Sequence, residues 1–223
     1  MALTFVIAGW LTLTPPTTAF AADIGTVGCG LDNLFTTTAG SLGPLDYRVA
    51  TPSQRHLVES NHFTAPVESL QHGKTATTPG PDIAYTLSVY PNHARALKAM
   101  MQLGFRNKTE RPEGAAYTVE CYFARSLRFA PDDLSVRMVY ALYLHGKGQN
   151  SAALDELLAL SKIAGDNGNL HYNLGLIYFE LKKYDQALDE AHIAYRMGFQ
   201  LPGLRDKLKR LGKWREPESA DAG

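Results

Sequence analysis

From about residue 82 onwards, small and apolar residues recur at a fixed interval along the chain. Counting from Gly175, Ala187 follows 12 residues later and Ala194 a further 7 residues on. The same offsets occur one interval earlier, at Ala141, Ala153 and Leu160. Two antiparallel helices approach closely only where small residues face each other, while larger apolar residues fill the flanks. The pattern therefore predicts a repeating helix–turn–helix unit of about 34 residues.

Three such units are expected, at residues 94–133, 134–167 and 168–201. The first is longer, because Pro91 and Pro131 mark equivalent junctions and lie further apart than one unit. The surplus falls in the turn-rich segment RNKTERPEG at 106–114, and the second helix of this unit is expected at 115–129. A repeat array needs a terminal cap with a polar outer face. Residues 202–214 are predicted to supply it, through a helix with apolar positions at Leu204, Leu208 and Leu211.

The chain before the repeats is read as an irregular arm at 23–81. Residues 23–52 are rich in Gly, Thr and Pro and show no helical period. A short helix is expected from Ser53 to Ser60, with Ser53 as its N-cap, and another from Pro66 to His72. Residues 73–81 are expected to form a loop, with helix from about Asp82.

Residues 1–22 have the pattern of a secretory signal peptide. An apolar stretch from Ala2 to Leu13 is followed by two prolines and then by Ala19-Phe20-Ala21, with small residues where signal peptidase requires them. Cleavage is expected after Ala21 or Ala22. The alternative is a buried N-terminal helix, since no Lys or Arg precedes the apolar stretch. No apolar run reaches the roughly 20 residues that a membrane span needs.

Export changes the interpretation of the two cysteines, Cys29 and Cys121. Two thiols in an oxidising compartment are more often paired than free, so a disulfide between them is expected to tie the arm to the repeats. The alternative is lipid attachment at Cys29, because Thr26-Val27-Gly28-Cys29 loosely resembles a lipobox.

The balance of charges and the lack of known catalytic motifs argue against several classes of function. The chain has 22 Lys and Arg against 22 Asp and Glu. It therefore lacks the basic excess typical of nucleic-acid binding, and no nucleic-acid partner is expected. No nucleophile elbow, P-loop or dinucleotide fingerprint is present, so the chain is predicted to be no enzyme and to need no cofactor. A basic cluster between Lys207 and Arg215 is expected to be a solvated face of the cap, and residues 215–223 a disordered tail.

The segment GNLHYNLGLIYFELKKYDQALDEAHIAY at 168–195 resembles a tetratricopeptide repeat (TPR), and the resemblance covers residues 82–214. It implies an all-α fold of the TPR-type α-solenoid class that recognises other proteins through a groove lined by the first helix of each repeat. Segments such as LDYR at 45–48 and YPNHARAL at 90–97 resemble a group of exported proteobacterial TPR proteins with no assigned activity. That narrower resemblance implies a periplasmic location.

The positions that usually line a TPR groove identify the candidate binding residues. In this chain they are Arg95, Lys98, Gln102, Met138, Leu142, Tyr172, Asn173, Leu176 and Phe179. Asn173 stands where carboxylate-clamping TPRs place an asparagine, and Arg95 and Lys98 carry the charge that such a clamp needs. The matching residue of the middle repeat is Val139, which departs from the clamp pattern.

Two further interpretations stay open. The arm itself could occupy the groove, which would make the chain a structural subunit of an envelope secretion or polysaccharide-export complex. Alternatively Glu59 and His62, in an E-x-x-H spacing that places both on one helix face, could belong to a metal-dependent enzyme. Sites of that kind need several such motifs on facing helices, whereas only one is visible. The favoured hypothesis is a scaffold that binds a segment of an envelope protein.

Overall fold

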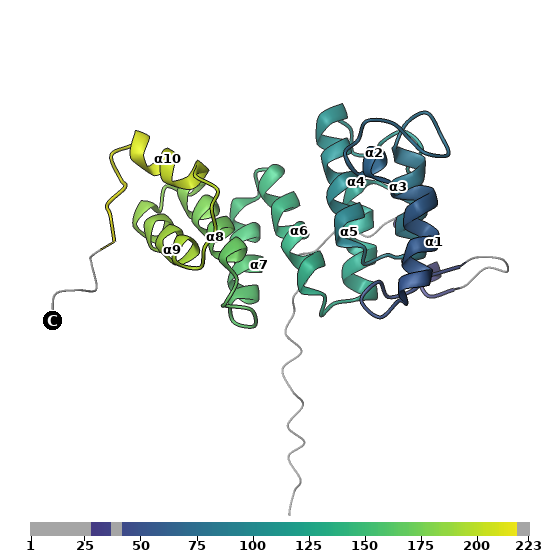
Figure 1. The fold of residues 1–223 in the computed structure, drawn as a ribbon, viewed down its shortest axis with the longest axis horizontal. Helices are drawn as coiled ribbons and strands as arrows, with labels where there is room; N and C mark the ends of the chain where they lie inside the picture. The colour runs from purple at the N-terminus through teal and green to yellow at the C-terminus, as the bar shows by residue number, and fades with distance from the viewer. Residues whose placement is uncertain (1–27, 37–41, 218–223) are drawn as a thin grey trace, which may run out of the picture.

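The computed structural model describes residues 28–36 and 42–217, and in these ranges every regular element is helical. An all-α fold is therefore confirmed. The elements are the 3₁₀-helix η1 Leu31–Asn33 and the α-helices α1 Pro52–His62, α2 Ala65–Glu68, α3 Gly80–Val89, α4 Ala94–Asn107, α5 Val119–Phe129, α6 Leu134–Gly146, α7 Asn150–Ser161, α8 Gly168–Glu180, α9 Tyr184–Arg196 and α10 Gly203–Arg210. Figure 1 shows α1 to α5 gathered at one end, α8 to α10 at the other, and α6 between them.

The helices α6 to α9 repeat with a strict period. α6 and α8 begin at Leu134 and Gly168, and α7 and α9 begin at Asn150 and Tyr184, so both pairs of starts are separated by the same predicted interval. Their N-caps repeat too. Asp133 accepts hydrogen bonds from the N–H groups of Ser135 and Val136, and Asn167 does the same for Asn169 and Leu170. These side chains satisfy donors that the first helical turn leaves open.

The turns and side-chain pairs of the two units also correspond. Gly148 and Lys182, which occupy equivalent positions, both have positive φ, at 77° and 59°. Arg137 Nη2 donates to Glu156 Oε2 at 3.0 Å, and His171 Nδ1 lies 2.6 Å from Glu190 Oε2 at the equivalent positions. Each pair joins the two helices of one unit.

Small residues lie buried where the helices cross. Ala141, Ala153, Ala187 and Ala194 are all fully inaccessible to solvent. A β-carbon added to Gly175 would lie 3.3 Å from the carbonyl oxygen of Ala187 and 2.4 Å from a methyl group of Leu204. The prediction that small residues let the backbones approach is confirmed where Gly175 of α8 meets Ala187 of α9.

The N-terminal helices have bounds different from those predicted. α1 begins at Pro52, and its N-cap is Thr51 rather than Ser53, because Thr51 and Gln54 form a capping box. α2 is a single turn at 65–68 and does not reach His72, since Leu70 adopts a positive φ of 60°. α3 starts at Gly80, slightly before the expected Asp82.

The second helix of the first expected unit begins later than predicted. α5 starts at Val119 and not at Ala115, because the Thr118 side chain caps it by accepting from the N–H of Cys121. The N–H of Val119 donates to the carbonyl of Glu110, which holds the insertion against the start of α5.

A disulfide joins Cys29 to Cys121, which confirms the expected pairing. Arg125 on α5 donates to the carbonyl oxygens of Cys29 and Gly30 at 3.0 and 2.6 Å, so residues 28–36 are fastened to α5. Because the sulfur of Cys29 is bonded to that of Cys121, it is not available for lipid attachment. The alternative of a lipid anchor at Cys29 is therefore wrong.

The cap α10 packs against α8 and α9. Leu204 and Leu208 are buried, but Leu211 is half exposed, because the helix ends at Arg210. Trp214, which follows the cap, packs on α9, with its ring 5.0 Å from that of His192. In the part of the chain that the structure describes, no helix is both long and apolar enough to cross a membrane. The predicted signal peptide, residues 1–22, and residues 218–223 of the expected tail lie outside the described residues.

Candidate functional site

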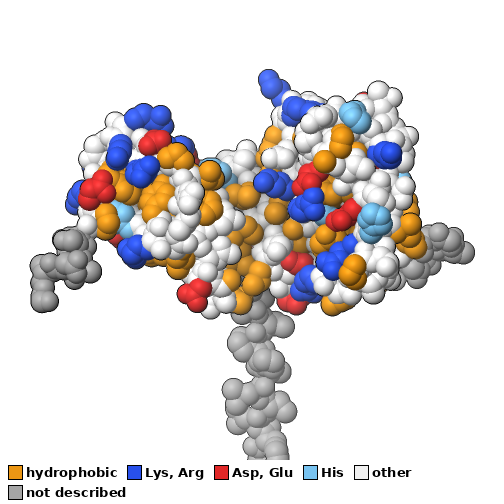
Figure 2. Space-filling model, viewed as in Figure 1, with side chains coloured by type: hydrophobic (Ala, Val, Ile, Leu, Met, Phe, Trp, Pro, Cys, Tyr) orange, Lys and Arg blue, Asp and Glu red, His pale blue; other side chains and the backbone are white. Residues whose placement is uncertain are grey.

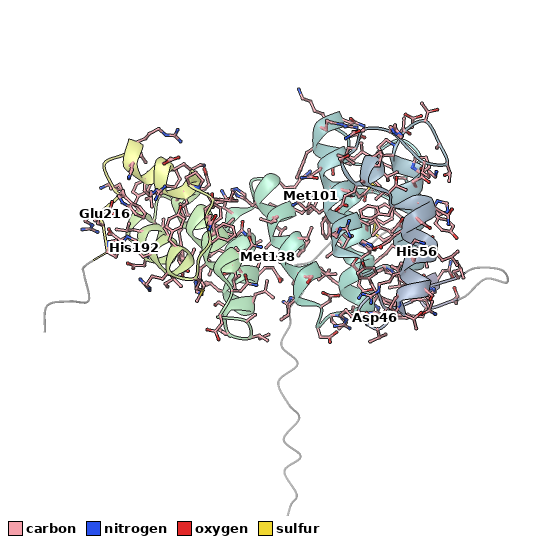
Figure 3. All side chains as sticks on the ribbon, in the orientation of Figure 1. Asp46, His56, Met101, Met138, His192 and Glu216 are labelled. Atoms are coloured by element: carbon pink, nitrogen blue, oxygen red, sulfur yellow. A yellow bond between two sulfur atoms is a disulfide. The ribbon has the colours of Figure 1, made fainter. Side chains whose placement is uncertain are left out.

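A groove of about 450 Å³ lies between the first turns of α4, α6 and α8. Three residues of the predicted set line it: Arg95 and Lys98 from α4, and Met138 from α6. The apolar surface comes from Ala94, Leu134, Met138, Val139, Leu160, Ala164 and Leu170, and the polar surface from Arg95, Lys98, Ser135, Asn167 and Asn169. We call this the α4–α6–α8 groove. Figure 3 marks its place on α6 at Met138.

Arg95 stands at the rim, where contacts with the arm hold its side chain. Its Nε donates to Glu68 Oε1 at 2.8 Å, and its guanidinium lies 5.5 Å from the ring centre of Phe63. The hydrogen bond from Arg95 outweighs burial and keeps the pKa of Glu68 below its usual value. Lys98, one turn further along α4, has an exposed side chain. The positive charge that faces the groove most freely is therefore that of Lys98.

The opposite wall presents amides. Asn169 and Asn167 lie at the start of α8, both with exposed side chains. Asn173, the predicted clamp residue, is buried, and its Nδ2 donates to the carbonyl oxygen and the Oδ1 of Asn169 at 2.8 and 3.0 Å. It does not line the groove but fixes the side chain of Asn169, which does.

The remaining predicted residues lie elsewhere. Tyr172 packs on Phe199, with the ring centres 4.6 Å apart, and Leu176 and Phe179 pack in the same cluster beside Leu204 and Leu208. α10 thus folds back over this part of α8. Gln102 is exposed on α4 and Leu142 is half buried on α6, and neither lines the groove.

At one end the groove continues into a hollow of about 540 Å³, which shares Ala94, Arg95, Leu134 and Ser135 with it. Tyr47 and Arg48 of the arm line this end, together with Asp132. Arg48 donates to Asp46 at 2.7 Å and to Asp132 at 2.9 Å, and its hydrogen bond lowers the pKa of Asp46 to about 2. The described arm therefore forms an end wall of the hollow and contributes no residue to the central groove.

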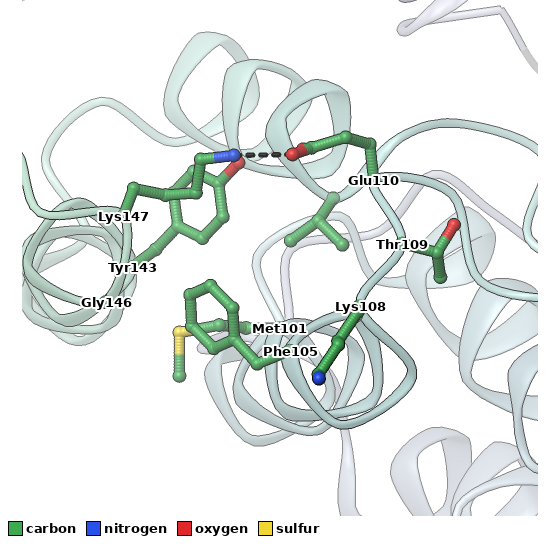
Figure 4. Close-up of a pocket in the computed structure, with 10 residues that line it drawn as sticks. Met101, Phe105, Lys108, Thr109, Glu110, Tyr143, Gly146 and Lys147 are labelled. Carbon is green, nitrogen blue, oxygen red and sulfur yellow. Dashed lines mark hydrogen bonds and ion pairs between the residues drawn. The ribbon is translucent and has the colours of Figure 1, made fainter.

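A second pocket, of about 410 Å³, lies at the opposite ends of α4 and α6 and is drawn in Figure 4. Met101 and Phe105 of α4, Tyr143 of α6 and Val119 of α5 form its apolar walls. Residues 108–110 of the insertion close one side, and Glu110 there pairs with Lys147. We call this the insertion pocket. In the sequence, only the additional residues at 106–114 indicated that this part of the chain differs from the regular unit. They did not predict a pocket or the part that Tyr143 plays in it.

Glu59 and His62 turn to different partners. Glu59 accepts from the hydroxyl of Tyr47 at 2.7 Å and pairs with Nε2 of His93 at 3.1 Å, whereas His62 Nδ1 lies 3.0 Å from Asp82. Within residues 28–36 and 42–217, no group of three or more His, Cys, Asp or Glu side chains is placed to hold a metal ion. The E-x-x-H pair instead joins α1 to α3 and α4.

The space-filling view gives the setting of these sites. Figure 2 shows an indented outline between the α8–α10 end and the α1–α5 end, with hydrophobic side chains visible across the middle of the face. No family model, no curated protein and no solved structure matches this chain. The function of the groove is therefore inferred from its own residues.

Proposed function

We propose that this chain is a non-enzymatic scaffold of the TPR type in the bacterial cell envelope, and that it binds a segment of another envelope protein in the α4–α6–α8 groove. The regular period of α6 to α9, with matching caps, turns and inter-helix pairs, supports the repeat architecture. The Cys29–Cys121 disulfide fits an oxidising compartment such as the periplasm.

The observation that carries the binding proposal is the composition of the groove. Its lining is largely apolar and includes Met138 of α6, with Lys98 contributed by α4 and the amide of Asn169 by α8. Apolar floors with a few placed polar groups are typical of recognition sites, and methionine adapts to irregular partners. A segment with an apolar side chain over Met138, an acidic side chain toward Lys98 and a main-chain group toward Asn169 is complementary to it.

The described arm does not compete for this groove. Residues 28–36 lie against α5, and α1 and α2, which belong to residues 42–81, pack against α3 and α4. None of these arm residues lines the groove. Of the alternatives from the sequence, the structural subunit with a self-filled groove thus draws no support from these contacts. A bound segment from another protein remains the better fit.

The test is photo-crosslinking in cells that export the chain. A photoreactive amino acid replaces Met138 in the groove or, as a matched control, Asp155, which is exposed on α7 and lines neither pocket. We expect one dominant envelope protein to be captured from position 138 and not from 155, and Lys98→Glu to reduce its yield. Equal capture from both positions, or capture only of residues 23–60 of the same chain, would overturn the groove proposal.

A further inference from the structure

The insertion pocket lies away from the groove proposed above. The groove uses the first turns of α4 and α6, at Arg95 and Met138, while the pocket uses their last turns, at Phe105 and Tyr143. The labels of Met101 and Met138 in Figure 3 mark the two places. At about 410 Å³ the pocket is in the size range of small-ligand sites.

The hydroxyl of Tyr143 is the unexplained feature of this pocket. The residue is 4% exposed, and its Oη has no hydrogen-bond partner among the described residues. Buried polar groups nearly always have such partners, so an unpartnered one at a pocket wall points to a ligand group. In Figure 4 the ring runs from α6 toward the Lys147–Glu110 ion pair at the edge of the pocket.

The walls favour an aromatic ring. Phe123 stacks on Tyr143 with ring centres 4.9 Å apart and planes at 27°, and Tyr143 stacks on Phe105 at 5.9 Å and 19°. Phe105 ends the row and is 38% exposed. Aromatic rings pair favourably at centre distances of about 4.5–7 Å, so a further ring can extend this row from the open side of Phe105.

The charges around the pocket favour a neutral ligand. Lys108 and Lys147 are positive, and Glu110 is negative. The C-terminal ends of α4 and α6, at Asn107 and Gly146, each add about half a negative charge. These contributions nearly cancel, and an anion would also have to compete with Glu110 for Lys147.

We propose that the insertion pocket binds an uncharged aromatic side chain of a partner polypeptide, whose main-chain carbonyl accepts a hydrogen bond from Tyr143 Oη. This proposal depends on the proposed function only in that the ring belongs to a bound protein. Access requires the Lys147–Glu110 pair to move aside. The side chains of both residues are partly exposed, at 32% and 62%, and exposed ion pairs resist displacement only weakly.

Methyl NMR of methionine tests the pocket directly. The chain has five methionines, and Met101 lines the insertion pocket while Met138 lines the groove. The probe is N-acetylphenylalanine methylamide, compared with N-acetylleucine methylamide and with the acid N-acetylphenylalanine. We expect the aromatic amide to shift the Met101 methyl signal and not that of Met138, and to bind more tightly than either of the other two compounds.

The variant Tyr143→Phe removes only the unpartnered hydroxyl. Because that hydroxyl has no partner in the described part of the fold, thermal stability should be unchanged or raised, while binding of the aromatic amide weakens by about threefold to tenfold. Tyr90→Phe is the matched control, since Tyr90 is the other buried tyrosine whose hydroxyl is unpartnered among the described residues, and it lines neither site. It should leave binding unchanged.

Three results would overturn the proposal: a Met101 signal that does not respond to the aromatic amide, equal binding by wild type and Tyr143→Phe, or tighter binding of the acid than of the amide. The first of these includes a response of Met138 alone, which would leave the groove proposal standing. Failure of the groove proposal is seen separately, in the crosslinking from position 138.

Discussion

The helices before α6 and those from α6 to α9 are held together in different ways. In the second region the pairs that join helices are local: Arg137–Glu156 and His171–Glu190 each span 19 residues. In the first region the spans reach much further: His62–Asp82 spans 20 residues and Arg95–Glu68 spans 27, but His93–Glu59 spans 34, the disulfide 92 and Arg125 with Cys29 96. The first region therefore combines such shorter ties with a few very long-range contacts, whereas the second depends on a repeated local pattern.

Loss of the disulfide should have the largest effect and should separate the two regions. Replacing Cys29 and Cys121 by Ala frees a loop closed across 92 residues, and the expected loss in free energy of unfolding is about 4 kcal/mol. Urea unfolding measures the loss, and hydrogen exchange locates it. Protection should fall in α5 and residues 28–36 and persist in α8 and α9. An equal fall in α8 and α9 would show that the regions are not distinct.

Overfilling a helix crossing tests the repeated region. Ala187 is fully buried on α9, facing α8. Ala187→Leu should lower the free energy of unfolding by about 1–3 kcal/mol, because the extra carbons have no space. Gln186→Leu introduces the same side chain at an exposed neighbouring position and should change stability little. Similar losses for both variants in urea unfolding would contradict the close crossing.

Acid should weaken the first region through His93. Burial lowers the pKa of His93 from 6.5, against its hydrogen bond to Glu59. The unfolded chain then takes up a proton there at a higher pH than the folded chain. The stability contributed by the neutral ring is complete above pH 6.5 and is lost as the pH falls below it.

The capping role of His93 adds to this loss of stability and also provides a control variant. Nδ1 of His93 accepts from the N–H of Ala96, so protonation also removes the N-cap of α4. His93→Asn keeps a capping acceptor and does not titrate, so its stability should change less than that of wild type between about pH 7.5 and about pH 5.5. Equal changes in the two proteins would remove His93 as the cause.

The smallest effect is expected for the exposed tie between the arm and the groove. Arg95→Ala removes the contacts with Glu68 and Phe63, and it should cost less than about 1 kcal/mol, since both charged side chains are partly solvated. Lys207→Ala, which removes the exposed pair between α10 and Glu180 of α8, is the matched comparison. A loss from Arg95→Ala several times that from Lys207→Ala in urea unfolding would show that the arm depends on this contact.

The sequence predicted the repeated region better than the first. The regular spacing of small residues located α6 to α9 because the contacts that define them are local and recur. In the first region the ends of helices depend on particular caps. Thr51 with Gln54 starts α1, and Thr118 starts α5, and periodicity does not show which of several nearby Ser and Thr residues will cap.

The candidate site was predicted in part. The TPR resemblance implied that Arg95, Lys98 and Met138 line one groove, and the structure brings these three residues together. The resemblance could not show that α10 returns over Tyr172 and Phe179, because that contact depends on the path of residues 197–202. Tyr143 was not predicted as a site residue, because a sequence does not show whether the hydroxyl of a buried tyrosine has a hydrogen-bond partner.

The disulfide has a consequence for how the chain is made. The protein is synthesised from its N-terminus, so Cys29 appears 92 residues before Cys121 and has no partner of its own chain during that interval. With two cysteines in all, only one intramolecular pairing exists, and no wrong internal bond needs to be reshuffled. The error that remains is a bond between two nascent chains. Biogenesis of this protein should therefore be sensitive to how crowded its newly made copies are, and little dependent on an isomerase.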